Sequence, residues 1–229
     1  MDQNAVPPPP PPPPYVPAPP AALVLPWEIP GRPAVDALVE TVKLIATSTD
    51  EAFRRMPVVG DIARPLLYGV IIGSIGPLLA RFYSLFLPNP LVGFLQRSFP
   101  GRAGEWASSP GIAGFFVVPI AVAVGLFLGA GIVHLCLMLV SGATGGYLTT
   151  FRVICYASTG QLFQVIPFLG GILALVFVVL LEIKGLAIAH RTTPGKAAAA
   201  VLIPIVFCCV CVVGVVVAFG AALAGFMSR

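Results

Sequence analysis

Ionisable residues lie inside apolar segments of this chain, where such residues are rare unless they have a structural or functional role. Glu182 and Lys184 lie two positions apart in the run "VFVVLLEIKGLAIAH" at residues 176–190. An ionised side chain in hydrocarbon costs roughly 3 kcal/mol or more, so it is expected to be paired, to reach the membrane edge or to be functional. Residues two apart on a helix point to nearly opposite sides, so these two cannot pair with each other.

Arg152 is the partner that we predict for Glu182. Arg152 lies fifteen residues before Pro167 and Glu182 lies fifteen residues after it. If residues 148–189 form an antiparallel helical hairpin that turns at Pro167, equal arms give equal depth, about 22 Å from the turn. Lys184 is then free to extend to the lipid headgroups.

Two further polar residues are expected near this depth, which gives a candidate intramembrane polar cluster of His134, Arg152, Tyr156 and Glu182. One interpretation is a site for a proton, a headgroup or a small solute. The other is a structural clamp, because a buried ion pair specifies geometry more reliably than it adds stability. We favour the clamp, since one pair without a ring of polar residues makes a poor transport path. His134 alone is interpreted as a hydrogen bond between helices rather than a metal ligand.

The sequence has no motif typical of an enzyme. It shows no nucleophile elbow, phosphate-binding loop, paired carboxylates or metal-ligand spacing. The segment "TTPGKAAAA" at 192–200 is typical of a helix start. The five cysteines all fall in apolar runs and are interpreted as small apolar residues. We therefore predict no catalytic residue, no metal, no cofactor and no enzymatic activity.

The composition indicates a membrane protein. Of 229 residues, 58% are hydrophobic and only 10% are charged, whereas soluble domains have about 25% charged residues. The net charge of +4 is too small to suggest nucleic acid binding. We predict an all-α integral membrane protein, a bundle of five transmembrane helices preceded by a short amphipathic helical element and a disordered proline-rich tail.

Residues 1–33 are predicted to be the disordered tail. Pro7 to Pro14 is an unbroken proline run, which extends as polyproline II. Residues 7–20 are then either a plain spacer, which we favour, or a ligand for the aromatic-lined groove of a polyproline-binding partner.

Residues 34–65 are predicted to form the amphipathic helices. They are expected to lie either on the membrane surface or against the protein's own loops. In the first arrangement, Phe53 and Met56 face lipid while Arg54 and Arg55 reach the headgroups.

Residues 66–229 are predicted to form the transmembrane domain, with each span judged against the roughly 20 apolar residues that a bilayer requires. Spans are expected at about 66–87, 112–140, 148–166, 168–189 and 197–226. Proline and paired glycines favour a turn between the third and fourth spans, formed by Pro167, Gly170 and Gly171.

Pairs of small residues four positions apart permit close helix approach. The sequence has three such pairs, Gly69 with Gly73, Gly125 with Gly129, and Ala221 with Gly225. Packing within the bundle is the default interpretation, and contact with a second copy or with another membrane protein remains open.

Charge predicts the orientation of the five spans. With the N-terminus inside, inner segments hold seven Lys and Arg residues and outer segments hold four. This bias favours a cytoplasmic N-terminus, and we predict a bacterial inner membrane location.

Several segments resemble one known family. They are "FRRMPVVGDIARPLLYGVIIGSIG" at 53–76, "HLCLML" at 134–139, "TTFRVICYAS" at 149–158 and "IPFLGGILALVFVVLLEIKGLAIAHRTTPGKAAAAVLIP" at 166–204. In this order they resemble the Yip family of Ypt/Rab-interacting membrane proteins, particularly its bacterial branch. The resemblance implies five transmembrane helices with a cytoplasmic N-terminus. It also implies kinship with eukaryotic proteins that act in vesicle trafficking and bind Rab-type GTPases and each other.

Two functions are consistent with these features. The first is a non-enzymatic membrane protein that organises membrane or recruits partners through its N-terminal region. The alternative is a small transporter or lipid-handling protein that uses a polar site at Arg152 and Glu182.

Overall fold

The computed structural model of the chain describes residues 24–84, 113–167 and 169–227. Its secondary structure in these ranges is helical, without strands. Four of the described helices are long and apolar enough to cross a membrane. They are α3 (Ala63–Ser84), α6 (Ala113–Leu139), α8 (Gly170–Ala189) and α9 (Pro194–Met227). The protein is therefore a multi-pass membrane protein, as its composition predicts.

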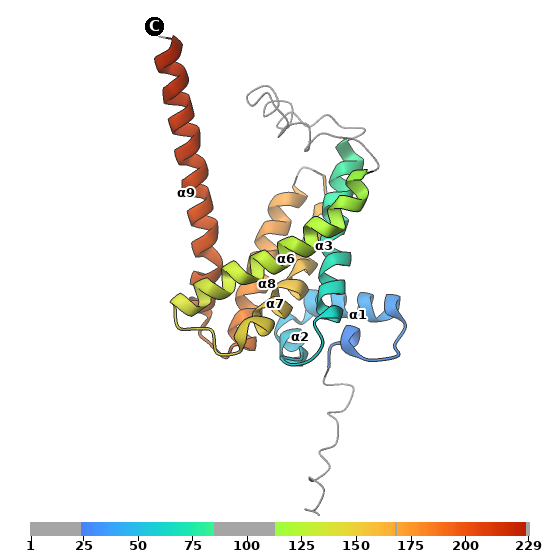
Figure 1. The fold of residues 1–229 in the computed structure, drawn as a ribbon. Coiled ribbons are helices and arrows are strands. Elements are labelled where there is room, and N and C mark those ends of the chain that lie inside the picture. Colours follow the sequence, from blue (N-terminus) through green and yellow to red (C-terminus); the bar gives the residue numbers. More distant parts are fainter. Residues whose placement is uncertain (1–23, 85–112, 168, 228–229) are drawn as a thin grey trace, which may run out of the picture.

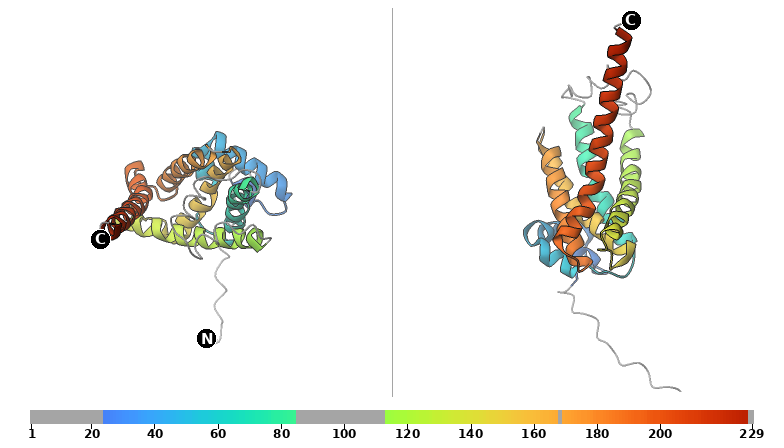
Figure 2. Two further views of the ribbon diagram at one scale, coloured as in Figure 1. Left: turned by 90° about the horizontal axis from the view of Figure 1, so that it is seen from above. Right: turned by 90° about the vertical axis from the view of Figure 1, so that its left-hand side faces the viewer.

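The long helices α3, α8 and α9 share one general direction in Figure 1, whereas α6 is inclined to them. Figure 1 shows α6 crossing obliquely from the far end of α3 toward the start of α9, and it packs on both. Two short helices, α1 (Ala34–Thr47) and α2 (Thr49–Arg55), lie together at one end of the bundle. The C-terminal half of α9 projects at the opposite end (Figure 2).

Three of the observed helices begin and end within a few residues of expected spans. α6, α8 and α9 lie where 112–140, 168–189 and 197–226 were predicted. α3 begins at Ala63, three residues before the expected start, and residues 85–87 of that predicted span lie outside the described residues.

The predicted span 148–166 is not a single α-helix. It consists of α7 (Gly146–Ala157) followed by the 3-10 helix η3 (Ser158–Val165). The hydroxyl groups of Ser158 and Thr159 donate to the Cys155 and Tyr156 carbonyls. Such local side-chain bonds compete with regular helical hydrogen bonding, and they occur where the helix changes type.

α7 is the centre of the bundle. It packs against α3, α6 and α8, and all nine residues of 149–157 are buried. A 12-residue α-helix is only about 18 Å long, less than the roughly 30 Å of a bilayer core. The apolar character of α7 therefore reflects burial within the protein.

The residues just before α1 do not belong to a disordered tail. Residues 1–23 lie outside the described residues, but Pro26–Glu28 form a 3-10 turn, η2. Leu25 and Trp27 are 1% and 9% exposed in this turn. The boundary at residue 33 is therefore wrong, because the apolar side chains of "LPW" are buried against the helices. We call residues 25–28 the N-terminal turn.

The two short helices pack on the protein rather than presenting their aromatic face to lipid. Phe53 and Met56 are only 2% and 4% exposed, so the prediction that they face lipid is wrong. The reason lies in α8, where Gly185 leaves room for the Phe53 ring. A Cβ at Gly185 would lie 2.7 Å from Phe53 Cε1, so any larger residue would push α2 outward.

The small-residue pairs differ in their surroundings. A Cβ at Gly69 would lie 2.8 Å from Leu126 Cδ1 and 3.2 Å from Cys155 Cα, and one at Gly73 would lie 3.0 Å from Val122. α3 thus approaches α6 and α7 closely at both glycines.

The second pair does not pack within the bundle. Among the described residues, nothing lies within 4 Å of a Cβ built at Gly125 or Gly129, so the default interpretation is wrong for these two within the described bundle. The side chains at Ala221 and Gly225 lie outside the described part of the chain.

The expected turn between η3 and α8 is present. Gly170 N–H donates to the Ile166 carbonyl at 2.9 Å, and Leu169 N–H donates to the Pro167 carbonyl at 2.8 Å. A Cβ at Gly170 would overlap the backbone of residues 163–164, whereas Gly171 faces open space. η3 and α8 therefore pack as two arms of a hairpin.

Candidate functional site

The most deeply buried charge in the described chain belongs to α7. Arg152 is 2% exposed. Its Nη1 donates to Glu28 Oε1 at 2.9 Å, and its Nη2 donates to the backbone carbonyl of Asp61. The Glu28 side chain is itself only 7% exposed. A buried cation is thus matched by a buried anion from a distant part of the sequence.

Tyr156 completes this arrangement from one turn further along α7. Residues four apart share one helix face, so Tyr156 and Arg152 point to the same place. The Tyr156 hydroxyl donates to Glu28 Oε1 at 2.6 Å. One carboxylate oxygen therefore accepts two hydrogen bonds, one of them from a cation. We call Glu28, Arg152 and Tyr156 the anchor site.

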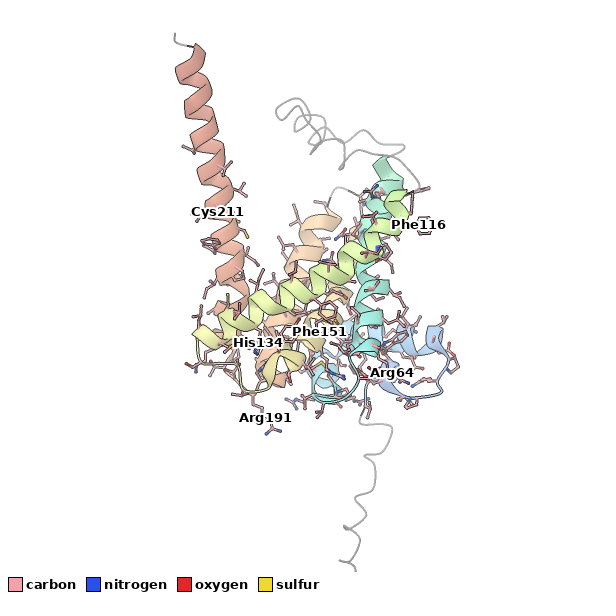
Figure 3. The ribbon with its side chains drawn as sticks, in the orientation of Figure 1. Arg64, Phe116, His134, Phe151, Arg191 and Cys211 are labelled. Carbon is pink, nitrogen blue, oxygen red and sulfur yellow. The ribbon has the colours of Figure 1, made fainter. Side chains whose placement is uncertain are left out.

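The N-terminal turn positions Glu28 through its neighbours. The backbone N–H of Trp27 donates to Thr41 Oγ1 in α1 at 2.9 Å. The indole Nε1–H of Trp27 donates to the Arg64 carbonyl at 2.7 Å, and Arg64 Nη1 donates to the Glu28 carbonyl at 2.7 Å. Figure 3 shows Arg64 at the start of α3, beside the short helices. The turn is thus held between α1 and α3.

An aromatic column continues from the turn into the bundle. The rings of Trp27 and Tyr68 meet edge to face at 6.0 Å, and those of Tyr68 and Tyr156 lie 4.9 Å apart. Thr159 Oγ1 donates to the Tyr156 carbonyl, so the Tyr68 hydroxyl is the donor in its 2.7 Å bond to Thr159. The polar tips of these buried tyrosines are all hydrogen-bonded, as expected in an apolar interior.

The predicted pairing of Arg152 with Glu182 is wrong. The guanidinium pairs with Glu28, and Glu182 has no hydrogen bond or ion pair among the described residues. The equal-arm argument assumed α-helix on both sides of Pro167. η3 rises about 2.0 Å per residue instead of 1.5 Å, so its eight residues lengthen that arm by about 4 Å.

Lys184 reaches toward a different partner. Its Nζ lies 3.3 Å from Asp50 Oδ1 in α2, and both side chains are more than half exposed. An exposed pair of this kind contributes less than about 1 kcal/mol. Lys184 is thus at the surface of the bundle, as expected of a lysine free to extend to headgroups.

The two histidines of the chain form a second cluster around one hydroxyl. His134 Nδ1 lies 2.8 Å from Thr150 Oγ1, and His190 Nε2 lies 2.9 Å from the same atom. His190 Nδ1 accepts the Gly145 N–H at 3.0 Å. His134 therefore bridges α6 and α7, while His190 ties the α8–α9 connection to the start of α7.

The donors in this histidine cluster follow from the Gly145 bond. Because His190 Nδ1 accepts, a neutral His190 carries its proton on Nε2 and donates to Thr150. The Thr150 hydroxyl then donates to His134 Nδ1. Burial, together with the smaller effect of the nearby His134, lowers the pKa of His190 from its ordinary 6.5 to about 4, so His190 is neutral at pH 7.

The predicted polar cluster is therefore split between two places. Arg152 and Tyr156 meet at the anchor site, His134 belongs to the histidine cluster, and Glu182 contacts neither through a hydrogen bond in the described chain. Among the described residues, no group of three His, Cys, Asp or Glu could hold a metal ion. The arrangement at the anchor site binds a carboxylate of its own chain.

Sequence reasoning missed Glu28 and Trp27. The available signal was "LPWEIP" at residues 25–30, in which a Trp-Glu pair stands between two prolines. The proline content of the preceding segment hid it, because composition assigned the whole region to a tail.

Comparison with known protein families gives a match over most of the chain. The Yip1 domain profile matches residues 42–216, which is most of the chain. No curated protein and no solved structure is significantly similar to it. The resemblance seen in the sequence is confirmed, and the chain belongs to the Yip1 domain family.

Proposed function

We propose that the protein is a non-enzymatic membrane anchor that presents its N-terminal segment to partner proteins at one face of the membrane. The observation that carries this proposal is the ion pair between Glu28 and Arg152, buried at 2.9 Å. The pair holds the N-terminal turn, which directly precedes α1, against the bundle. Pro7 to Pro14, a run suited to aromatic-lined grooves, ends fourteen residues before Glu28.

The proposal includes five crossings and a cytoplasmic N-terminus. α7 and η3 together supply the remaining crossing, which α3, α6 and α8 shelter. In support, Figure 1 places α1 and α2 at one end of the bundle and the C-terminus of α9 at the other, which an odd number of crossings produces. Figure 3 shows Arg64 and Arg191 at the end of α1 and α2, as expected of the positive inner face of a bacterial inner membrane.

Crosslinking and pull-down from native membranes test the recruitment role. The full chain, a form lacking residues 1–20 and Glu28→Gln are compared. We expect the truncated form to lose partners that the full chain captures. We expect Glu28→Gln to capture fewer of them, because the segment is no longer held at the bundle.

Asp36→Asn is the matched control, since Asp36 is an exposed carboxylate on α1 outside the anchor site. It should capture the same partners as the full chain. Identical partners for the full chain and the truncated form would exclude recruitment through the proline-rich segment.

Lipid handling remains a second candidate because of Glu182. This carboxylate lies in a membrane-crossing helix without a polar partner in the described chain, and such groups often mark transport or lipid sites. Glu182→Leu separates the two functions. A folded variant that loses lipid movement but keeps its partners would favour lipid handling.

A further inference from the structure

A polar groove lies where α2 meets the last turns of α8, away from the anchor site and the histidine cluster. Its volume is about 510 Å³. Three hydroxyl-bearing residues (47–49), two carboxylates (Asp50 and Glu51) and two cations (Arg54 and Lys184) line it. We call it the α2–α8 groove.

The groove follows from the packing of Phe53 against Gly185. The ring of Phe53 is buried and sits where a Cβ of Gly185 would be, at 2.7 Å. The next residue on α2, Arg54, and the preceding residue on α8, Lys184, are both exposed. The contact between Phe53 and Gly185 therefore places Arg54 and Lys184 on the outer surface, each next to the helix that carries the other.

The four charged side chains in the groove have no net charge, and most of them are free to contact a ligand. Arg54 and Lys184 contribute two positive charges, and Asp50 and Glu51 contribute two negative charges. Arg54 forms no ion pair within the described ranges, and the Lys184–Asp50 contact at 3.3 Å is exposed and weak. Glu51 also forms an ion pair with Arg55 on the same helix. A ligand that suits this groove carries both signs of charge and no net charge.

An apolar ridge leads away from the groove along α8. Leu180, Val176 and Ile172 precede Lys184 at intervals of four residues, which places all four on one side of the helix. These three apolar side chains are 50%, 48% and 65% exposed. The ridge extends about 18 Å from Lys184 along a helix that can cross the membrane.

The depth of the groove is that of the lipid headgroups. Lys184 lies five residues before Ala189, where α8 ends, which is about 8 Å of helix. A lysine near a helix end extends its ammonium group to the interface. Charges therefore lie at the level of the headgroups, and the apolar ridge lies at the level of the acyl chains.

We propose that the α2–α8 groove binds the headgroup of a phospholipid of the phosphatidylethanolamine class, with an acyl chain along the ridge of α8. The phosphate lies between Arg54 and Lys184. The primary ammonium donates to Asp50 and to the neighbouring hydroxyls. Phosphatidylcholine has no N–H to donate, and phosphatidylglycerol has no cation to balance Asp50 and Glu51.

Thermal unfolding of the delipidated full chain in detergent tests this proposal. Phosphatidylethanolamine, phosphatidylcholine and phosphatidylglycerol with identical acyl chains are titrated, and soluble phosphoethanolamine serves as the headgroup without chains. We expect phosphatidylethanolamine to raise Tm at about fivefold lower concentration than the other two lipids, the effect of one added charge contact. We expect phosphoethanolamine to leave Tm unchanged.

Substitutions locate the site. The double variant Arg54→Gln/Lys184→Gln should lose the response to all three lipids, while its Tm without lipid stays near that of the wild type because both residues are exposed. Asp50→Asn should respond equally to the ethanolamine and choline lipids. Arg191→Gln, which removes an exposed cation outside the groove, should keep the wild-type preference.

Three outcomes would overturn the proposal. Equal responses of the wild type to the three lipids would mean that the groove does not discriminate between headgroups. A full Tm shift with phosphoethanolamine alone would show that the acyl chain does not contribute to binding at this site. An unchanged preference in the double variant would place lipid binding elsewhere on the protein.

Discussion

Glu28 and Arg152 lie 124 residues apart in the sequence and form a 2.9 Å ion pair inside the bundle. The pair connects the turn before the first helix to the helix at the centre of the protein. A buried ion pair adds little stability compared with a well-packed apolar pair, but removing one partner leaves an uncompensated charge. The contribution of this pair is therefore revealed by single substitutions.

Glu28→Ala should destabilise the protein by about 3–5 kcal/mol, because Arg152 then remains buried without a counterion. The free energy of unfolding is measured by titrating dodecyl sulfate into protein held in mild detergent micelles. Arg152→Met should cost a similar amount, since Glu28 is then the uncompensated charge.

The double variant Glu28→Leu/Arg152→Met tests whether the two effects are coupled. We expect it to be more stable than either single variant, because no buried charge remains. Glu40→Ala is the control, since its pair with Arg32 is partly exposed and should contribute less than about 1 kcal/mol. Additive losses in the double variant would show that the two residues do not depend on each other.

The fluorescence of Trp27 shows whether the N-terminal turn is packed against the bundle. The chain has two tryptophans, Trp27 and Trp106, so Trp106→Phe leaves one emitter. Because Trp27 is only 9% exposed, its fluorescence should resist quenching by acrylamide. Adding Glu28→Ala should increase quenching and shift the emission to longer wavelength. Unchanged quenching would mean that the indole bond to Arg64 holds the turn without the ion pair.

The sequence predicted the importance of Arg152 but not its partner. A lone arginine in an apolar run is conspicuous, because lipid excludes an unpaired charge. The pairing with Glu28 joins residues too far apart for any periodic pattern to relate them. Local spacing therefore directed attention to Glu182, the nearest acidic residue in the predicted hairpin.

The third predicted span shows a second limit of sequence reasoning. Its apolar residues predict a helix, and the turn at Pro167 follows from proline and glycine chemistry. The change to a 3-10 helix at Ser158 depends on hydroxyl bonds and on the approach of Gly160 to α8, where a Cβ would lie 2.7 Å from Val178 N. The hydroxyl bonds are local and the Gly160 contact is tertiary, and hydropathy reveals neither.

Acid should weaken the fold through His190. Burial holds its pKa at about 4 in the folded protein, below 6.5 in the unfolded chain, so the folded state binds fewer protons between these values. Stability is therefore full above pH 6.5, is lost as the pH falls, and levels off below pH 4 for this residue. The loss is roughly 3 kcal/mol at most. Tm measured from pH 7.5 to 4 checks it.

His190→Asn isolates this contribution from the titration of carboxylates. The variant should have a lower Tm at pH 7.5, because the bonds to Gly145 and Thr150 are altered. Its Tm should fall less steeply between pH 6.5 and 4 than that of the wild type. Thr150→Val, which removes the shared hydroxyl but keeps His190, should retain the pH dependence. Identical slopes in wild type and His190→Asn would assign the acid sensitivity to other groups.

Two glycines in equivalent sequence patterns should respond oppositely to alanine. A methyl group at Gly69 would meet Leu126 at 2.8 Å and the Cys155 backbone at 3.2 Å, so Gly69→Ala should destabilise the bundle by about 1–3 kcal/mol through overpacking. Gly125→Ala adds its methyl group in open space and should change the unfolding free energy by less than about 1 kcal/mol, with the better helix propensity of alanine in its favour. Unfolding in detergent micelles measures both. A large loss at Gly125 in micelles would instead show that a second copy packs against α6 there, because the described part of this chain places nothing within 4 Å of a Cβ at that glycine.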